Sequence, residues 1–451
     1  MGYLLAFTVV LGALLFIYSR LKPTNSRQPP GPWGLPVLGH MHLLGAKPGK
    51  TLLKWRKKYG PIVSVRIGKM PAVAISDVYL IQEAFGQRVF SGRPTYKIDE
   101  FGKKGIVRGD DIETTEQRKF FHSAFNSKES RDSAEGRIRE EVDALIFMKN
   151  DKPRDDPQTL EFLQNLSRTI RVPNFIEVIA MFTNFVDFLV KNDRKKNIQD
   201  AMSIIKKKFK EHKLTWVPGQ PRDLTDAFWD KQDSMAKESP KFRANAEEHF
   251  LGSIYDASIA GYDTTSITKE WIFVYLTKFP EVRRKFQEEI DAKVGLDRTP
   301  SLSDEPNMPY VQAVLNEVLR ISSIGPLSVF HRAMEDVEFK GYFIPKDTIV
   351  IGNLYAANWD KDIWGDPHVF RPERFLDSQG NFVQRDELLA FSTGKRLCIG
   401  ERLARNNMFL FSTIIFQEFN TEFAGTEPSF EGSFGLFSRP YSFSLKFIKR
   451  H

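Results

Sequence analysis

The sequence predicts a mainly helical protein with a small β-sheet, and two patterns support that fold class. From residue 77 to residue 275, most windows combine the apolar spacing of amphipathic helices with residues that favour helices. A strand pattern is clear in residues 61–75, where Val63, Val65 and Ile67 alternate with polar residues ahead of a turn. We therefore expect a helical body with a hairpin near its N-terminal end.

Composition restricts the class of protein further. The chain has 451 residues, of which 41% are hydrophobic and 27% are charged, enough apolar surface to bury a large core. This composition excludes disordered and collagen-like proteins. A single cysteine cannot form an intramolecular disulfide, which excludes a disulfide-framed extracellular scaffold and favours a reducing compartment. The net charge of +8 suits an anionic membrane surface or an acidic protein partner and does not require nucleic acid.

The N-terminal end predicts a membrane anchor followed by a stiff hinge. Residues 1–18 carry no charged side chain, and three basic residues follow between positions 20 and 27. By the positive-inside rule, this basic flank places the rest of the chain in the cytosol. Residues 28–36 are rich in proline and cannot continue a helix. We expect an anchor helix over residues 1–20, a basic and proline-rich hinge over residues 21–39, and one catalytic domain over residues 40–451.

Other stretches of the body predict structure without chemistry. Helical spacing is clear in residues 134–149 and 198–213, whereas residues 172–190 are apolar but interrupted by two acids and predict a buried or membrane-surface helix. Lysine-rich residues 191–196 and 206–213 are interpreted as solvated helix faces, because neither belongs to a recognised nucleic-acid module. The run Gly45–Thr51 is one residue short of a phosphate loop, so we do not expect nucleotide binding there.

The lone cysteine, Cys398, lies in the pattern that carries chemistry. Gly394 and Gly400 flank it and allow the backbone to approach another group closely. An amphipathic helix pattern starts at Glu401, so the helix N-terminus would stabilise a thiolate at Cys398. A free cysteine is commonly buried and inert. The two glycines and the charge of Arg396 favour a thiolate ligand for a metal instead.

The spacing of Phe391, Gly394, Arg396, Cys398 and Gly400 resembles the haem-ligand loop of the cytochrome P-450 family. Three further stretches match motifs of that family in the right order. They resemble its oxygen-activation helix, its ExxR motif and its PERF motif, and they comprise Ala260–Thr265, Glu317–Arg320 and Phe370–Phe375. The resemblance covers the whole chain and is closest to the eukaryotic microsomal branch of class II haem-thiolate monooxygenases.

The resemblance implies haem b with the Cys398 thiolate as its axial ligand, held between the oxygen-activation helix and the helix after the cysteine loop. A thiolate ligand pushes electron density onto iron and favours O–O cleavage. In the oxygen-activation helix, Ala260 and Gly261 leave room for dioxygen, and Asp263 and Thr264 are expected to relay protons. The alternative for Thr264 is a hydrogen bond back to a helix carbonyl, which would also bend the helix.

Further residues receive roles from the same resemblance. Glu317, Arg320 and Arg374 are expected to form a buried network that holds the cysteine loop and takes no part in catalysis; the alternative is a surface ion pair of little energetic weight. Haem propionates are carboxylates and need cationic or hydrogen-bonding partners. The expected partners are Arg118, His331 and Arg396.

The implied function is insertion of one oxygen atom from O2 into a hydrophobic substrate, at the endoplasmic reticulum membrane. The chain carries no flavin or Rossmann fingerprint, so electrons would come from NADPH through a flavoprotein reductase, with cytochrome b5 as a further partner. The reductase would dock near the basic residues Lys395, Arg402 and Arg405. Two rival functions remain open: a haem-thiolate isomerase or dehydratase, which would not need Asp263 and Thr264, and an inactive haem or lipid binder.

The substrate would be a steroid, terpenoid, fatty acid or xenobiotic, because the segments implied to line its pocket are rich in apolar residues. These segments are residues 91–107, 254–260 and 324–329. The sequence also departs from the family at three places. Thr114 stands where a tryptophan is usual, the stretch after Pro157 is shorter than the family pattern, and Asn406 and Asn407 replace an apolar and acidic pair.

Overall fold

The computed structural model describes residues 7–13, 27–35, 38–94, 104–146, 161–162, 164–165, 193–235, 240–434 and 437–451. The expected anchor lies outside the described residues except for residues 7–13, which are helical and exposed. In the described ranges, no helix is both long enough and apolar enough to cross a bilayer. The apolar stretch of residues 172–190 and the stretch directly after Pro157 also lie outside the described residues.

Helices dominate the described structure, as the sequence predicts. The predicted helices around residues 134–149 and 198–213 correspond to α6 and α9, and the lysines of the second lie on an exposed face, as expected. The α-helices are α2 (Met41–Leu44), α3 (Pro48–Tyr59), α4 (Val78–Gly86), α5 (Ile112–Phe125), α6 (Lys128–Ile146), α9 (Asp193–Lys213), α10 (Leu224–Met235), α11 (Pro240–Lys278), α12 (Pro280–Lys293), α13 (Pro309–Ser322), α14 (Leu354–Asn358), α15 (Lys361–Trp364) and α16 (Glu401–Glu418). Short 3-10 turns are η1 (Arg88–Phe90), η3 (Glu305–Asn307), η4 (Pro372–Phe375) and η5 (Gly394–Arg396).

A four-stranded sheet and three two-stranded ribbons make up the β-structure. The predicted hairpin is confirmed as an antiparallel pair, and its second strand adds β6 in parallel and then β3, in the order β1-β2-β6-β3. The ribbons pair β4 with β5, β7 with β10, and β8 with β9. The strands are β1 (Ile62–Ile67), β2 (Met70–Ile75), β3 (His331–Arg332), β4 (Val337–Phe339), β5 (Tyr342–Ile344), β6 (Ile349–Gly352), β7 (Phe419–Phe423), β8 (Ser433–Phe434), β9 (Ser438–Arg439) and β10 (Leu445–Lys449).

Local signals explain where two of the helices near the site begin. Asp77 precedes α4, and its carboxylate accepts the N–H groups of Tyr79 and Leu80. Asp111 precedes α5 and accepts the N–H of Thr114 at 2.8 Å. A carboxylate at this position satisfies helix N–H groups that have no partner in the helix itself. The two acids therefore fix the start of the helix that packs on the cysteine loop and of the helix that carries Arg118.

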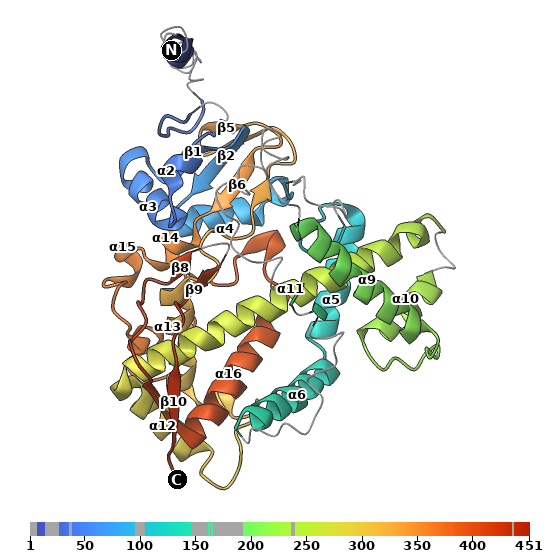
Figure 1. The fold of residues 1–451 in the computed structure, drawn as a ribbon, viewed down its shortest axis with the longest axis vertical. Helices are drawn as coiled ribbons and strands as arrows, with labels where there is room; N and C mark the ends of the chain where they lie inside the picture. Colours follow the sequence, from blue (N-terminus) through green and yellow to red (C-terminus); the bar gives the residue numbers. More distant parts are fainter. Residues whose placement is uncertain are drawn as a thin grey trace.

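The long helix α11 organises the interior (Figure 1). It crosses the molecule obliquely and contacts α5, α9, α12, α13 and α16. Trp271 of α11 and Phe409 and Phe416 of α16 are at most 1% exposed and belong to one hydrophobic cluster. The sheet lies toward the N-terminal end with α3 and α4 (Figure 1), over clusters of its own. Burial of these large side chains fixes α11, which carries the oxygen-activation motif, against α16, which follows the cysteine loop.

Candidate active site

The cysteine loop is fixed by close packing against α4. Gly394 has φ of +73°, and a Cβ atom there would lie 2.1 Å from the backbone oxygen of Phe85. Only glycine satisfies both conditions, because other residues rarely adopt this backbone conformation and the space is filled. The N–H of Cys398 donates to the oxygen of Phe391 at 3.1 Å, and α16 starts three residues after the cysteine. The Phe391 ring in turn lies under the Arg405 guanidinium, 4.9 Å from it.

Cys398 combines exposure of the residue with a largely protein environment around its sulfur. The residue is exposed, yet desolvation by the surrounding protein raises the pKa of its thiol. The backbone N–H of Gly400 and the charge of Arg118 act in the opposite direction and favour the thiolate. An accessible sulfur whose thiolate is favoured by a backbone N–H and a nearby cation suits a ligand atom for a metal.

The middle of α11 also borders open space. Ala260 and Gly261 are exposed, whereas Phe250 and Trp271 on either side of them in α11 are at most 1% exposed, and a Cβ atom at Gly261 would meet no described atom within 4 Å. The hydroxyl of Thr264 donates to the oxygen of Ala260 at 2.6 Å, which is the alternative described above for this residue. Asp263 accepts a hydrogen bond from Arg439 of β9 at 2.5 Å. The roles of Asp263 and Thr264 in proton transfer stay predictions.

Two of the expected propionate partners come together beside the cysteine loop. Arg118 of α5 donates to the oxygens of Ile106 and Leu397, at 2.9 and 2.7 Å. Arg396 donates through Nη2 to the oxygens of Val107 and Gly109, both at 2.8 Å. The buried Nε of Arg396 has no hydrogen-bond partner within the described part of the chain. The Arg118 guanidinium therefore contacts the cysteine loop from α5, and Arg396, within the loop, keeps one N–H without a partner among the described residues.

His331 of β3 is 1% exposed and differs from the other two expected partners in charge. Its Nδ1 lies 2.7 Å from the oxygen of Phe90, so Nδ1 carries a proton and donates it. Its ring stacks on Phe85 with a centroid separation of 3.7 Å. Burial, and then the charge of Arg93, hold the pKa of His331 well below its usual value. The neutral ring has no second proton to donate to a carboxylate, so its expected contact would require protonation.

Sequence reasoning missed Arg93, which completes the cationic group. Its side chain is buried and donates to Val107 O at 3.0 Å, to Val329 O at 2.9 Å and to Phe330 O at 3.0 Å. It thereby joins two of the segments expected to line the substrate pocket. No signal in the neighbouring residues marks this arginine, because its partners are distant in the sequence.

The residues present fit haem. Burial, and next the charge of Arg118, lower the pKa of Arg396 to about 10. Cations that repel one another in a buried region are stabilised by an anion, and a guanidinium donates well to a carboxylate. The unused Nε of Arg396, the accessible thiol of Cys398 and the open middle of α11 suit a cofactor with carboxylates, an iron atom and an oxygen-binding face.

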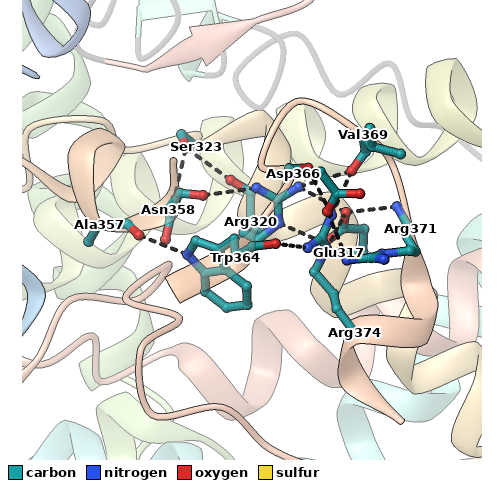
Figure 2. A network of polar contacts seen from close by, with 10 residues as sticks. All are labelled: Glu317, Arg320, Ser323, Ala357, Asn358, Trp364, Asp366, Val369, Arg371 and Arg374. Carbon is teal, nitrogen blue, oxygen red and sulfur yellow. Dashed lines mark hydrogen bonds and ion pairs between the residues drawn. The ribbon is translucent and has the colours of Figure 1, made fainter. Parts of the chain in front are cut away.

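The predicted buried network is present (Figure 2). Arg320 Nε and Nη2 lie 2.7 and 2.8 Å from the two carboxylate oxygens of Glu317, and both side chains are 0% exposed. Arg374 Nε donates to the same carboxylate at 3.1 Å, and the Arg371 N–H donates to it at 2.9 Å. This excludes the surface-pair alternative. The network ties α13 to η4 and, through Arg320 and the oxygen of Asn358, to the end of α14.

The link from this network to the cysteine loop is indirect. Arg405 of α16 donates to Asn316 of α13 at 3.1 Å, so α13 is held against the helix that follows the loop. Of the two unusual asparagines, Asn406 is buried, and Asn407 leaves its side-chain oxygen without a hydrogen-bond partner among the described residues. Thr114, where the family usually has a tryptophan, is fully buried, and its hydroxyl lies 3.4 Å from the oxygen of Gly105.

Comparison with known proteins identifies the family. The family model for cytochrome P450 matches residues 29–159 and 144–447. The chain is 32% identical to cytochrome P450 1A1 of Opsanus tau, over 93% of this chain and 90% of the relative. It is 32% identical to cytochrome P450 2J3 of Rattus norvegicus, over 91% and 89%. It is 31% identical to cytochrome P450 2C8 of Homo sapiens, over 96% and 97%.

The same matches bear on the short stretch after Pro157. The alignment with the Opsanus tau relative spans 478 positions, more than the 451 residues of this chain, so that relative has residues that the chain lacks. The two segments matched to the family model meet at residues 144–159, beside this stretch.

The motifs, the helical fold and the family match agree from residue 29 to residue 447. Family members hold a haem iron through a cysteine thiolate, and the chain's single cysteine lies in the loop that resembles the family's haem-ligand loop. The chain belongs to the cytochrome P450 family of haem-thiolate monooxygenases.

Proposed function

We propose that this monooxygenase inserts one oxygen atom from O2 into a small hydrophobic substrate, with electrons from NADPH through a separate flavoprotein reductase. The observation that carries the proposal is the exposed Cys398 in a glycine-fixed loop, with the Arg118 guanidinium on the neighbouring Leu397 carbonyl and the buried Arg396 two residues before the cysteine. We assign the endoplasmic reticulum membrane as its location, with residues 1–20 as the anchor, 21–39 as the hinge and 40–451 as the catalytic domain.

The cofactor of this proposal is haem b. Haem with a thiolate ligand supplies the activation of dioxygen. Cys398 provides the thiolate, and the Gly400 N–H and Arg118 stabilise its negative charge. Arg118 and Arg396 would bind the propionates, and His331 would be a third partner only in its protonated form. Gly394 keeps the loop close to α4, so the sulfur stays at a fixed place.

Asp263 and Thr264 carry the proposed proton transfer. The Thr264 hydroxyl donates a hydrogen bond to the Ala260 carbonyl, so the lone pairs of the Thr264 oxygen point away from that carbonyl. Residues next to each other in a helix do not face one another, so Asp263 and Thr264 present their side chains on different sides of α11. Transfer between them therefore needs a bridging water or a rotation of the Asp263 side chain away from Arg439.

The substrate pocket is assigned to apolar segments around the open middle of α11. Ile254 is half-buried, and Val329, in the segment after α13, is 45% exposed. These side chains favour an apolar ligand over a charged one. A steroid, a terpenoid, a fatty acid or a xenobiotic would satisfy this chemistry.

The reductase is proposed to dock on the side of the cysteine loop that carries exposed cations. Lys395 and Arg402 are exposed, whereas Arg405 is half-buried and paired with Glu401 at 2.8 Å. Lys395→Glu with Arg402→Glu should slow turnover with the reductase and leave peroxide-driven turnover nearly unchanged. Equal losses in both assays would contradict this docking site. Cytochrome b5 would compete for the same cations.

The first experiment is the carbon monoxide difference spectrum of the reduced protein beside that of Cys398→His. A red-shifted Soret band in the wild type that is lost in the variant would support thiolate ligation by Cys398. A blue-shifted band or no bound haem would favour an inactive haem or lipid binder. A thiolate spectrum with substrate rearrangement that needs neither NADPH nor O2 would favour an isomerase or dehydratase.

A further inference from the structure

One short turn connects the cations of the site to each other. Residues 104–111 precede α5, and the Gly109 N–H closes the turn by donating to the Gly105 oxygen at 3.2 Å. Its carbonyl groups accept hydrogen bonds from three arginines, of which Arg93 and Arg396 are buried and Arg118 is half-buried. The pairs are Arg118 with Ile106, Arg93 and Arg396 with Val107, and Arg396 with Gly109. The position of this turn therefore determines where the three guanidinium groups lie.

The opposite side of the turn is held by Asp256 of α11. Its Oδ2 accepts the Val107 N–H at 2.8 Å, and its Oδ1 accepts Arg108 Nε at 2.9 Å. The N–H of Val107 thus points toward the Asp256 carboxylate, and the carbonyl of Val107 points toward the guanidinium groups of Arg93 and Arg396. Hydrogen bonds aligned in this way polarise and strengthen one another in a buried region. Asp256 is 5% exposed, and within the described part of the chain its hydrogen bonds go to residues 107 and 108 and not to the cysteine loop.

The backbone of the turn packs closely against Asp256 at Gly105, which fixes the position of the turn on α11. Gly105 has φ of +102°, and a Cβ atom there would lie 2.4 Å from Asp256 Oδ2 and 2.9 Å from the Gly252 oxygen. Gly105 of the turn lies against Gly252 of α11, and the absence of a side chain on both residues lets the turn pack directly on the helix. The carboxylate and the turn are therefore fixed by shape as well as by hydrogen bonds.

Charge supports the same arrangement. Burial raises the pKa of Asp256, and the charge of Arg108 opposes that change. The ion pair between Asp256 Oδ1 and Arg108 Nε, at 2.9 Å, places a negative charge directly beside the turn that binds the three guanidinium groups. One buried anion therefore offsets part of the cost of gathering several cations.

We propose that Asp256 is a positioning residue for haem, which sets Arg118 and Arg396 toward the propionates by fixing the carbonyl groups of residues 106–109. The inference rests on the proposed function, because the propionate role of the two arginines is part of it. Asp256 acts through the turn and needs no contact with the cofactor.

The test compares haem with its dimethyl ester, which lacks the propionate charges. Each is loaded into the full chain, and its loss to an excess of a haem-acceptor protein is timed. The wild type should lose the ester at least about tenfold faster than haem, a difference of about 1.4 kcal/mol. Asp256→Asn should lose haem faster while the rate for the ester changes little, so that the ratio of the two rates falls at least threefold. A general folding defect would accelerate both losses equally.

The matched control is Glu248→Gln, because Glu248 lies on the same helix and pairs with Lys104 of the same turn, but at the exposed surface. Its ratio should equal that of the wild type. If Asp256→Asn does not fold, Asp256→Glu gives the same comparison, since it keeps the charge and displaces both hydrogen bonds. A wild type that does not distinguish haem from the ester would overturn the propionate assignment. If the wild type loses the ester faster than haem and the Asp256 variant shows the same ratio of the two loss rates, the role of Asp256 is overturned and the propionate assignment is not.

Discussion

Arg439 of β9 and Asp263 of α11 form an ion pair with 2.5 Å between Nη2 and Oδ1, and it joins the C-terminal hairpin to the helix expected to activate oxygen. Glu270, two turns further along α11, lies 3.9 Å from the same guanidinium. Two carboxylates thus share one cation. Burial raises the pKa of Glu270, Arg439 opposes that change and Asp263 adds to it.

The first prediction concerns the pH dependence that this cation controls. In Arg439→Met the pKa of Glu270 should rise further, because Asp263 then repels its charged form without compensation. A carboxyl whose folded pKa is raised stabilises the fold at low pH, and that contribution is lost as pH rises through the folded value. The free energy of unfolding should therefore fall by about 1 kcal/mol or less, relative to the wild type, between pH 4 and pH 7. Urea unfolding at several pH values measures this. Arg439→Lys is the control, because it keeps the positive charge. If the free energy of unfolding of Arg439→Met is lower than that of the wild type by the same amount at every pH, the prediction is contradicted.

The second prediction concerns the buried network of Figure 2. Arg320→Met leaves Glu317 buried with one fewer cationic partner, which costs about 3–5 kcal/mol. We expect low expression and a large drop in the urea midpoint. Arg284→Met is the control, because it breaks the exposed pair with Glu288 on α12 and should leave the midpoint unchanged. Equal midpoints in the two variants would show that the network contributes little to stability.

The third prediction concerns the close packing of Gly394 of the cysteine loop against α4. In Gly394→Ala a Cβ atom would overlap the Phe85 oxygen and force a residue other than glycine to φ of +73°, at a cost of about 2 kcal/mol or more. The sulfur would move, and the Soret band of the reduced carbon monoxide complex should shift to the blue in part of the sample. Gly86→Ala is the control, because Gly86 ends α4 beside this contact and a Cβ atom there would meet nothing described within 4 Å, so its spectrum should equal that of the wild type. A normal spectrum in both variants would contradict the prediction.

The sequence predicts what local patterns encode. The hairpin of residues 61–75, the helices α6 and α9 and the pairing of Glu317 with Arg320 follow from periodicity and from spacing on one helix. Residues whose partners are remote in the chain escape such reasoning. Asp256 meets a backbone 149 residues away and Asp263 meets an arginine 176 residues away.

Remote pairing also changes what a motif means. The sequence places Asp263 in a motif and suggests that its carboxylate is available, whereas tertiary packing brings Arg439 onto it. Arg93 illustrates the same limit, since a single arginine in a sequence gives no sign that three remote carbonyl oxygens will bury it. Each of these cases depends on the fold as a whole and not on the neighbouring residues.

The last prediction tests whether the Thr264 hydroxyl has a role beyond its hydrogen bond to the helix. Thr264→Val keeps the shape of the side chain and removes the hydroxyl that donates to Ala260. If that oxygen helps to deliver protons, electrons from NADPH should leave as hydrogen peroxide, and product formed per NADPH should fall about tenfold or more. Thr268→Val is a close control, because Thr268 makes the same kind of bond to the Thr264 oxygen at 2.7 Å, one turn further along α11. Both variants lose one helix hydrogen bond, so a structural role alone predicts equal yields of product and peroxide. A lower product yield in Thr264→Val only, with an unchanged Soret band, supports proton delivery by Thr264. Equal yields in the two variants would leave Thr264 with only its hydrogen bond to the Ala260 carbonyl.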